Sequence, residues 1–249
     1  MSTPQRPSAL PCPTCRARRG AVCHAWPDDA IGRLYAAARP ERIAAGEWIV
    51  RPESASNETF MLREGLVHIS RFAQDGKRQI LAFLFPGDFF GFTAEERYRF
   101  GAFAVEDVHV CRFQRSELKA VTLYTPDAAF SVQRFMARII DGQNELVFTL
   151  GRKTAIERVA SFIWYLDYRQ RKLGHAAGPV RVPMSRLDIA DFLGLTSESV
   201  SRAFTQLKRD GVIRLPDPLH IEVPDMPRLR EVAIVPDDPA PVEPPTATR

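Results

Sequence analysis

The sequence has no run of apolar residues that approaches the roughly 20 needed to cross a bilayer. Its first residues, MSTPQRPSALPC, also lack the apolar stretch of a secretory signal peptide. These absences argue against a membrane protein and against secretion, and we expect a cytoplasmic chain in which thiols stay reduced. The length of 249 residues and the hydrophobic content of 45% suit two modest soluble domains.

Cysteine is scarce, and three of the 4 cysteines lie in one short segment, PCPTCRARRGAVCH. Cys12, Cys15 and Cys23 have the spacing C-x2-C-x7-C, while Cys111 lies far along the chain in VHVCRF. In a reducing compartment such a cluster favours a metal site, and four thiolates match the ligand set of a cubane iron–sulfur cluster. Two alternatives remain open: a structural zinc site that uses His24 with the three clustered cysteines, and a redox-active Cys12-x-x-Cys15 dithiol.

Short β-rich stretches separated by glycines fill residues 47–113. The clearest strands are residues 66–70, 79–85 and 108–113. The turn signals Asp75-Gly76 and Pro86-Gly87-Asp88 separate them at close to regular spacing. Regular short strands with glycine turns predict a small antiparallel barrel or roll.

The hydrophobic period changes at residues 127–152, where positions recur at alternating steps of four and three, as in a coiled-coil seam. The seam positions are Val132, Met136, Ile139, Gln143, Leu146 and Leu150. We interpret this seam as the interface of a homodimer, and the alternative is a core helix packed on its own roll. Gln143 is the single polar position, and such a residue can tune register and dimer strength.

Charge is distributed unevenly in the sequence that follows this predicted helix. Residues 151–215 hold 12 Lys and Arg against 6 Asp and Glu, whereas residues 216–249 hold 3 against 7. A basic segment of this kind suits DNA binding, because neutralising phosphates supplies much of the affinity. The acidic, proline-rich end, PDDPAPVEPPTATR, predicts a disordered tail.

The basic segment contains SRLDIADFLGLTSESVSRAFTQLKRDGVIRL, which predicts two short helices followed by a strand. Ser185 can cap the first helix with Asp188 in the capping-box position, and Gly194 can end it. Thr196 can cap a second helix that runs from Ser197 to about Arg209. This arrangement is a helix-turn-helix followed by a wing.

Three polar residues of the second helix, Glu198, Ser201 and Arg202, share one face at the end that would enter the major groove. Arginine can donate two parallel bonds to a guanine, glutamate can accept from a cytosine amine, and serine is short enough to approach a thymine methyl. The face that turns inward is formed by Val200, Phe204 and Leu207. Ser197 and Lys208 complete the predicted DNA-contacting set, with Lys208 reaching phosphate at most.

Nearly the whole sequence resembles the CRP/FNR superfamily of bacterial transcription regulators. The resemblance rests on LDIADFLGLTSESVSR, LGRKTAIERVASFI and FMLREGLVHISRFAQDGKRQILAFLFPGDFFGF, and the E-x-x-S-R pattern is similar to the FNR/FixK branch. It implies an α+β fold with an N-terminal antiparallel β-roll like a cyclic-nucleotide-binding domain, a long dimerisation helix and a C-terminal winged helix-turn-helix. The expected divisions are a cysteine-rich arm (1–30), a β-roll sensor (31–125), the helix (126–152), the DNA-binding domain (153–224) and the tail (225–249).

The resemblance also implies a homodimeric regulator without catalytic residues. The stretch GFTAEERYRFGAFAVED lacks the Arg-Ser/Thr pair of cyclic-nucleotide binders, so no cyclic nucleotide is expected. The FNR branch carries an N-terminal cysteine cluster and one cysteine on a roll strand, and the longer cysteine gap here looks like its FnrL/FnrN-type members. A [4Fe-4S] cluster on Cys12, Cys15, Cys23 and Cys111 is thereby implied, with nitric oxide or redox thiols as other signals.

Three functional expectations follow from the same resemblance. Oxygen would degrade the cluster, weaken the dimer and release DNA. The operator would be an inverted repeat, TTGAT-N4-ATCAA. The hairpin at Asp75-Gly76 would contact RNA polymerase, as in a transcription activator.

Overall fold

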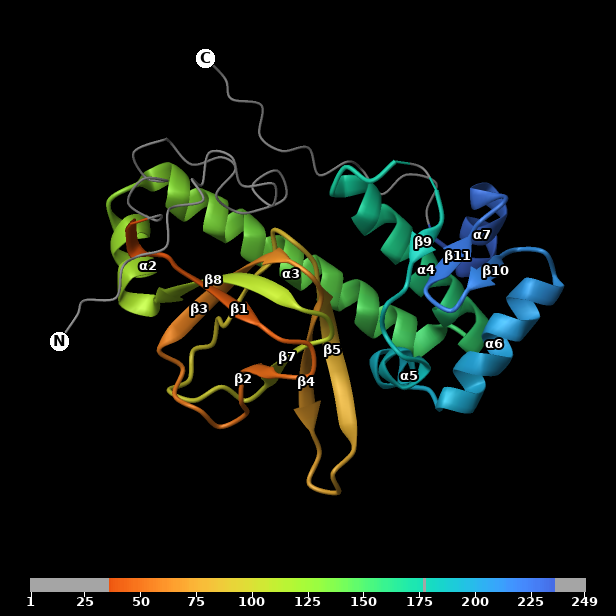
Figure 1. Ribbon diagram of the computed structural model, residues 1–249, viewed down its shortest axis with the longest axis horizontal. Coiled ribbons are helices and arrows are strands. Elements are labelled where there is room, and N and C mark those ends of the chain that lie inside the picture. Colours follow the sequence, from red (N-terminus) through yellow and green to blue (C-terminus); the bar gives the residue numbers. More distant parts are fainter. Residues whose placement is uncertain (1–35, 177, 236–249) are drawn as a thin grey trace, which may run out of the picture.

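The computed structural model describes residues 36–176 and 178–235, so Cys12, Cys15, Cys23 and His24 lie outside the described part. A β-roll and a helical DNA-binding domain lie side by side, and one long helix runs along both (Figure 1). The roll strands are β1 (Arg39–Ile43), β2 (Trp48–Val50), β3 (Glu58–Glu64), β4 (Val67–Phe72), β5 (Arg78–Leu84), β6 (Phe89–Phe90), β7 (Gly101–Ala104) and β8 (Val108–Gln114). The α+β class and the roll predicted from the sequence are confirmed.

The roll consists of two antiparallel four-stranded sheets, in the orders β1-β8-β3-β6 and β2-β7-β4-β5. Its interior is apolar, with Phe60, Leu62, Val67 and Val110 almost fully buried between the sheets. A glycine is required at the turn into β4, because Gly65 has φ +87° and a Cβ there would lie 2.4 Å from a backbone carbonyl oxygen. The three strands predicted from the sequence correspond to β4, β5 and β8.

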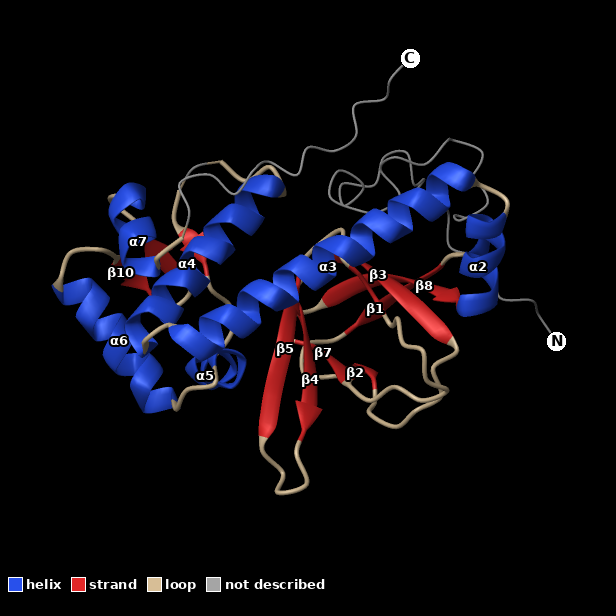
Figure 2. Ribbon diagram, turned by 180° about the vertical axis from the view of Figure 1, so that it is seen from behind, coloured by secondary structure: helices blue, strands red, loops and turns tan. Residues whose placement is uncertain are grey.

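Two helices follow the roll, α2 (Arg115–Leu123) and α3 (Pro126–Arg152). Pro126 occupies the first turn of α3, where its missing N–H costs nothing. With 27 residues, α3 is about 40 Å long and passes from the roll to the DNA-binding domain (Figure 2). Its bounds are those expected for the long helix from the sequence.

The DNA-binding domain contains α4 (Ala155–Lys172), α5 (Arg186–Leu193), α6 (Ser197–Arg209) and α7 (Met226–Ala233), with a sheet of β9 (Val180–Arg181), β10 (Arg214–Asp217) and β11 (His220–Glu222). The predicted capping residues are confirmed. Ser185 and Asp188 form a capping box on α5, Gly194 adopts a left-handed conformation after it, and the Thr196 side chain accepts from the Ser199 N–H. These local signals fix the helix-turn-helix.

The prediction of a tail over residues 225–249 is wrong for its first part. The structure places α7 there, and Asp225 caps this helix by accepting from the Arg228 N–H at 3.1 Å. Leu229 and Ala233 are fully buried, and the Ser161 hydroxyl of α4 donates to the Ala233 carbonyl at 2.9 Å. The proline-rich, acidic composition belongs to residues 236–249, whereas residues 226–233 have a capping residue and apolar side chains that pack on a distant helix. Residues 236–249 of the predicted tail lie outside the described part.

The two domains share one hydrophobic core. Phe83 of β5 lies against Phe162 of α4 and Phe192 of α5, with ring centroids 5.8 and 5.3 Å away. The covalent link between them is short, since α3 ends at Arg152 and α4 begins at Ala155. Within the described residues, no helix has the length and apolar character to cross a membrane.

Candidate nucleic-acid interface

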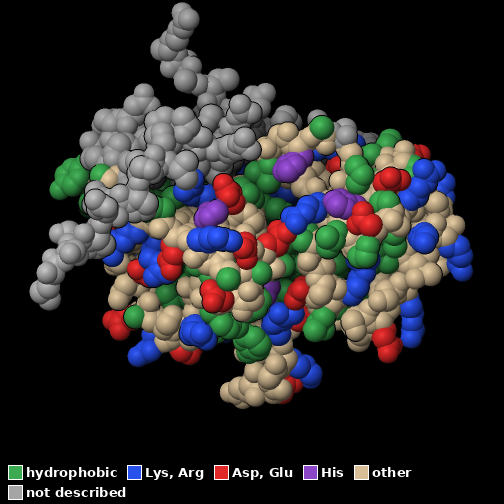
Figure 3. All heavy atoms as spheres, viewed as in Figure 1, with side chains coloured by type: hydrophobic (Ala, Val, Ile, Leu, Met, Phe, Trp, Pro, Cys, Tyr) green, Lys and Arg blue, Asp and Glu red, His purple; other side chains and the backbone are tan. Residues whose placement is uncertain are grey.

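One face of α6 is open to solvent along its whole length. The Glu198 and Arg202 side chains are 77% and 82% exposed, and they approach each other at 3.4 Å. Ser197, Ser201 and Lys208 are also exposed, so the structure brings all five predicted DNA-contacting residues to the outside of one helix. Figure 3 shows Lys and Arg side chains along the edge of the molecule where α6 lies in Figure 1.

The opposite face of α6 anchors the helix. Val200, Phe204 and Leu207 are at most 2% exposed, as the sequence predicted. The Arg186 guanidinium of α5 lies 3.4 Å from the centre of the Phe204 ring, which joins the two helices of the motif. α6 is thereby held rigidly while its polar face stays available.

The exposed face also contains residues that the sequence reasoning missed. A shallow groove of about 430 Å³ is lined by Ser201, Arg202, Thr205, Gln206 and Arg209. Thr205 and Arg209 continue the line of Ser201 and Arg202 at helical spacing, and that spacing was the signal that could have found them. Arg209 donates to the Gln206 side chain at 2.5 Å, so the second half of α6 presents a guanidinium and an amide together.

The predicted seam of α3 is buried only in part, because Ile139 is 38% exposed and Gln143 is exposed. Val132 and Met136 pack on the apolar cluster around Phe135, and the Gln143 amide donates to the Leu81 carbonyl of β5 at 3.4 Å. Ile139, Gln143 and Leu146 line a groove of about 610 Å³ between α3, β5 and α4. Leu150, the last seam position, lies beside the turn that follows α5. Packing inside the chain, the alternative weighed for this helix, accounts for Val132 and Met136, and the role of this seam between two copies stays a prediction.

A second stripe of α3 faces solvent instead. Phe130 and Ile140 are each 59% exposed, Val147 is 69% exposed and Phe148 is 52% exposed. Phe130, Gln133, Ala137, Ile140, Asn144, Val147 and Gly151 are separated by alternating steps of three and four, and all are exposed. This stripe has the heptad spacing of a helix pair.

Cys111 is the one predicted metal ligand within the described part. It lies on β8 between Pro40 of β1 and Met61 of β3, and it is 7% exposed in an apolar cluster with Phe89 and Phe113. Among residues 36–176 and 178–235, no group of three or more His, Cys, Asp or Glu is placed to hold a metal.

The roll segment GFTAEERYRFGAFAVED, residues 91–107, carries acidic, basic and aromatic side chains. Arg99 is 65% exposed and pairs with Glu95 at 3.5 Å on the surface. Tyr98 of this segment and Phe90 just before it belong to the apolar interior of the roll. That no cyclic nucleotide binds here stays a prediction.

Two protein-family models match the chain. A Crp-like helix-turn-helix domain matches residues 157–232, and a cyclic nucleotide-binding domain matches residues 40–123. The matches coincide with the DNA-binding domain, including α7, and with the roll.

Individual relatives match over most of their length. The nitrogen fixation regulation protein FixK of Bradyrhizobium diazoefficiens is 34% identical over 82% of this chain and 86% of its own. FixK of Azorhizobium caulinodans is 38% identical over 78% of each chain. The structure of FixK2 from Bradyrhizobium japonicum superposes with a TM-score of 0.73 at 33% identity, covering 78% of this chain and 96% of that one.

The roll, the long helix and the open recognition helix define a DNA-binding transcription regulator, and its relatives are regulators rather than enzymes. The chain belongs to the CRP/FNR family of transcription regulators.

Proposed function

We propose that the protein is a homodimeric, oxygen- or redox-responsive transcription activator that reads a TTGAT-N4-ATCAA-like inverted repeat. The proposal that the protein reads a DNA sequence rests on the open face of α6, where Glu198 and Arg202 form a charged pair that is exposed to solvent. Arg202 would donate to guanine O6 and N7, and Glu198 would accept from a cytosine amine. Binding to the chromosome would place the protein in the cytoplasm.

The operator proposal is tested with duplexes that differ at single positions. We expect the inverted repeat to bind at least about 1,000-fold more tightly than unrelated DNA at the same salt concentration. Changing the guanine of each half-site should remove most of that preference. Equal binding to all duplexes would contradict sequence reading by α6.

Dimerisation would use the exposed stripe of α3. Apolar side chains more than half exposed at heptad spacing are unfavourable in water and pair well with a second copy. Asn144 lies inside this stripe, where a polar residue can set the register of two helices. Two copies paired along α3 would present two α6 helices, as an inverted repeat requires.

For the signal, we propose a [4Fe-4S] cluster held by Cys12, Cys15, Cys23 and Cys111. The support within the described part concerns Cys111, which pairs in register with Pro40 on β1 and so lies beside the strand that the N-terminal segment enters. The 12 residues between Cys23 and Ala36 can span roughly 40 Å, enough to return to β8. When bound, such a cluster supplies an oxygen-labile link between the arm and the roll.

The cluster proposal is tested by anaerobic purification followed by metal analysis and a visible spectrum before and after exposure to air. We expect iron and acid-labile sulfide in near-equal amounts and an absorbance that bleaches in air. A colourless protein containing zinc would support a structural zinc site. A protein without metal would leave Cys12 and Cys15 as a redox dithiol.

The β4–β5 hairpin is the surface we propose for RNA polymerase. The tip of this hairpin projects beyond the rest of the roll (Figures 1 and 2), and Gly76 supplies the positive φ of its turn. The Asp75 carboxylate accepts from the Lys77 N–H at 3.1 Å and pairs with the Lys77 ammonium group. Replacing Asp75 should lower transcription in a reconstituted assay while leaving DNA affinity unchanged, and unchanged transcription would remove the proposal.

A further inference from the structure

Ion pairs join the roll to the DNA-binding domain at three places around their shared core. Within the described residues, they connect Arg78 with Asp188 and Asp191, Arg169 with Asp88, and Arg181 with Glu106. None of these side chains belongs to α6, so the recognition face stays open while the domains are held together.

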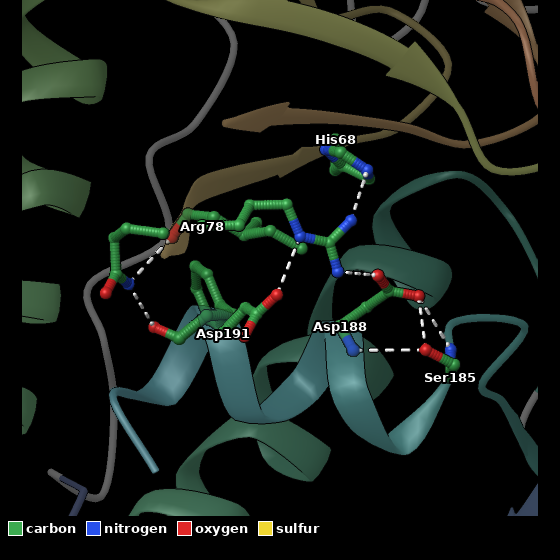
Figure 4. Close-up of polar contacts among 8 residues, drawn as sticks. His68, Arg78, Ser185, Asp188 and Asp191 are labelled. Atoms are coloured by element: carbon green, nitrogen blue, oxygen red, sulfur yellow. Dashed lines mark hydrogen bonds and ion pairs between the residues drawn. The ribbon is translucent and has the colours of Figure 1, made fainter. Parts of the chain in front are cut away.

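Arg78 makes the most direct connection to the helix-turn-helix (Figure 4). Its Nη2 donates to Asp188 Oδ1 at 2.5 Å and its Nε donates to Asp191 Oδ2 at 2.6 Å. The Arg78, Asp188 and Asp191 side chains are only 22%, 17% and 19% exposed. Charge-assisted bonds that are largely shielded from water are stronger than ordinary surface pairs.

Asp188 also completes the capping box at the start of α5, whose N-cap residue is Ser185. Its Oδ2 accepts from the Ser185 hydroxyl at 2.6 Å and from the Ser185 N–H at 3.1 Å. Burial acts to raise the pKa of Asp188, but the hydrogen bonds from Ser185 and Arg78 outweigh it and hold the pKa below its ordinary value. The carboxylate is therefore ionised at neutral pH and satisfies both partners.

Contact with two carboxylates one turn apart fixes α5 in rotation as well as in position. α5 is tied to α6 by Arg186 on Phe204 and by the tight turn at Gly194. A change at Arg78 would thus reach α6 through rigid elements. The covalent junction at Lys153–Thr154 is extended and two residues long, so it does not define the orientation by itself.

We propose that Arg78 is a positioning residue for DNA recognition: it holds α5 against β5 and thereby sets the orientation of α6 relative to the roll. This inference rests on the proposed function as a dimeric reader of an inverted repeat. Two half-sites about one helical turn apart accept only one arrangement of two α6 helices. A protein whose DNA-binding domain leaves this arrangement can bind the operator only during the fraction of time that the domain spends in it.

The test compares Arg78→Met with wild type in titrations of the operator duplex. If the variant keeps the competent arrangement about one tenth of the time, its Kd rises about tenfold. Arg42→Met is the control for the charge change, since Arg42 pairs with Asp107 on the surface of the roll at 2.7 Å and its loss changes net charge equally. An Arg78→Met affinity equal to that of Arg42→Met would overturn the proposal.

The salt dependence separates positioning from a direct phosphate contact. Loss of a phosphate contact lowers the slope of log K against log salt by about one, whereas a positioning residue leaves the slope unchanged. We expect unchanged slope and unchanged base preference in Arg78→Met. A slope reduced by about one would assign Arg78 to the DNA backbone and overturn the proposal.

Amide hydrogen exchange without DNA tests the orientation directly. We expect faster exchange in β5, α5 and the Lys153–Thr154 junction of Arg78→Met, and no change in β8. Unchanged exchange in all of these segments would overturn the proposal even if affinity fell. If wild type showed no operator preference, the proposed function would fail at that point, and the exchange result would still decide whether Arg78 fixes the domain.

Two milder variants keep the test decisive should Arg78→Met fold poorly. Arg78→Lys keeps the charge but cannot bind both carboxylates as a fork, so an affinity between those of wild type and Arg78→Met is expected. Asp191→Asn removes the charge of one of the two carboxylates that Arg78 contacts, so it should also weaken operator binding. Combining Asp191→Asn with Arg78→Lys should weaken binding by less than the two separate effects multiplied, because both act through one contact. Full affinity in Asp191→Asn and Arg78→Lys would overturn the proposal.

Discussion

The Arg158 guanidinium of α4 donates through Nη1 to the carbonyl of Leu193, the last residue of α5, at 2.9 Å. The same side chain donates to the carbonyls of Leu150 at 2.7 Å and Lys153 at 2.9 Å. The last carbonyls of a helix lack partners within that helix, so one arginine satisfies the ends of α3 and α5 together.

Replacing Arg158 by Met should therefore destabilise the protein. We expect a loss of about 2–3 kcal/mol in the free energy of unfolding, because partly buried carbonyls lose charge-assisted partners. Urea denaturation followed by circular dichroism measures this loss. Arg152→Met at the exposed end of α3 is the control and should cost less than about 0.5 kcal/mol. Equal effects of both variants would contradict the role of Arg158.

A pH dependence follows from His68, which is 2% exposed on β4 and stacks on Phe103 with ring centroids 5.2 Å apart. Burial, with the nearby Arg78 charge as the second cause, lowers the pKa of His68 from 6.5 to about 4. Between pH 6.5 and 4, His68 therefore binds a proton in the unfolded chain but not in the folded chain. The free energy of unfolding has no loss from His68 above pH 6.5. As the pH is lowered from 6.5 toward 4, protonation of His68 in the unfolded chain reduces that free energy by about 3 kcal/mol.

His68→Phe should flatten that part of the stability curve. Urea unfolding at pH 7, 5.5 and 4.5 provides the measurement, with each free energy compared between variant and wild type. His175→Gln, at an exposed histidine, is measured alongside as the control variant. An identical pH slope for His68→Phe and wild type would show that His68 is not the titrating group.

The cluster proposal predicts the effect of losing one thiol. Cys111→Ser should abolish the air-sensitive absorbance as completely as Cys12→Ser, because each removes one of four ligands. Iron content and the anaerobic visible spectrum are the measurements. The circular dichroism spectrum of Cys111→Ser reports whether the roll still folds around this 7% exposed position. A normal cluster in Cys111→Ser would return His24 to consideration as a ligand.

DNA reading predicts different outcomes for two residues of α6. Arg202→Ala should cost about 1–3 kcal/mol per half-site and relax the preference at the guanine. Lys208→Ala should weaken all sequences alike and reduce the salt slope by about one. Titrations against matched duplexes at several salt concentrations distinguish the two. If Arg202→Ala weakened every sequence equally, Arg202 would be a backbone contact.

The sequence predicted the helix-turn-helix well because its signals are local. Ser185, Asp188, Gly194 and Thr196 determine the two helix boundaries through their own side chains and backbone, without help from distant residues. The strands β4, β5 and β8 were predictable for the same reason, from glycine turns and short apolar stretches.

Features that depend on distant contacts escaped prediction. α7 does carry local start signals, Asp225 as its cap and a proline in its first turn, but the burial of Leu229 and Ala233 against α4 comes from the tertiary structure. The contact of Arg78 with α5 joins residues more than a hundred positions apart, which no local pattern records. On α3, two heptad registers carry apolar residues, and the roll covers Val132 and Met136 of one of them, which no local pattern records.

Substitutions at Ile139 and Ile140 distinguish the two registers of α3 as dimer interfaces. Ile140 is 59% exposed on the outer stripe, whereas Ile139 is 38% exposed and lines the groove toward β5. Ile140→Glu would place like charges across the two-fold axis of a helix pair, so we expect a folded monomer in sedimentation equilibrium. Ile139→Glu is the matched control, because it adds the same charge one residue away and should leave the chain dimeric, at some cost in stability. A monomer from Ile139→Glu together with a dimer from Ile140→Glu would restore the seam of Val132, Met136, Ile139, Gln143, Leu146 and Leu150 as the interface between copies.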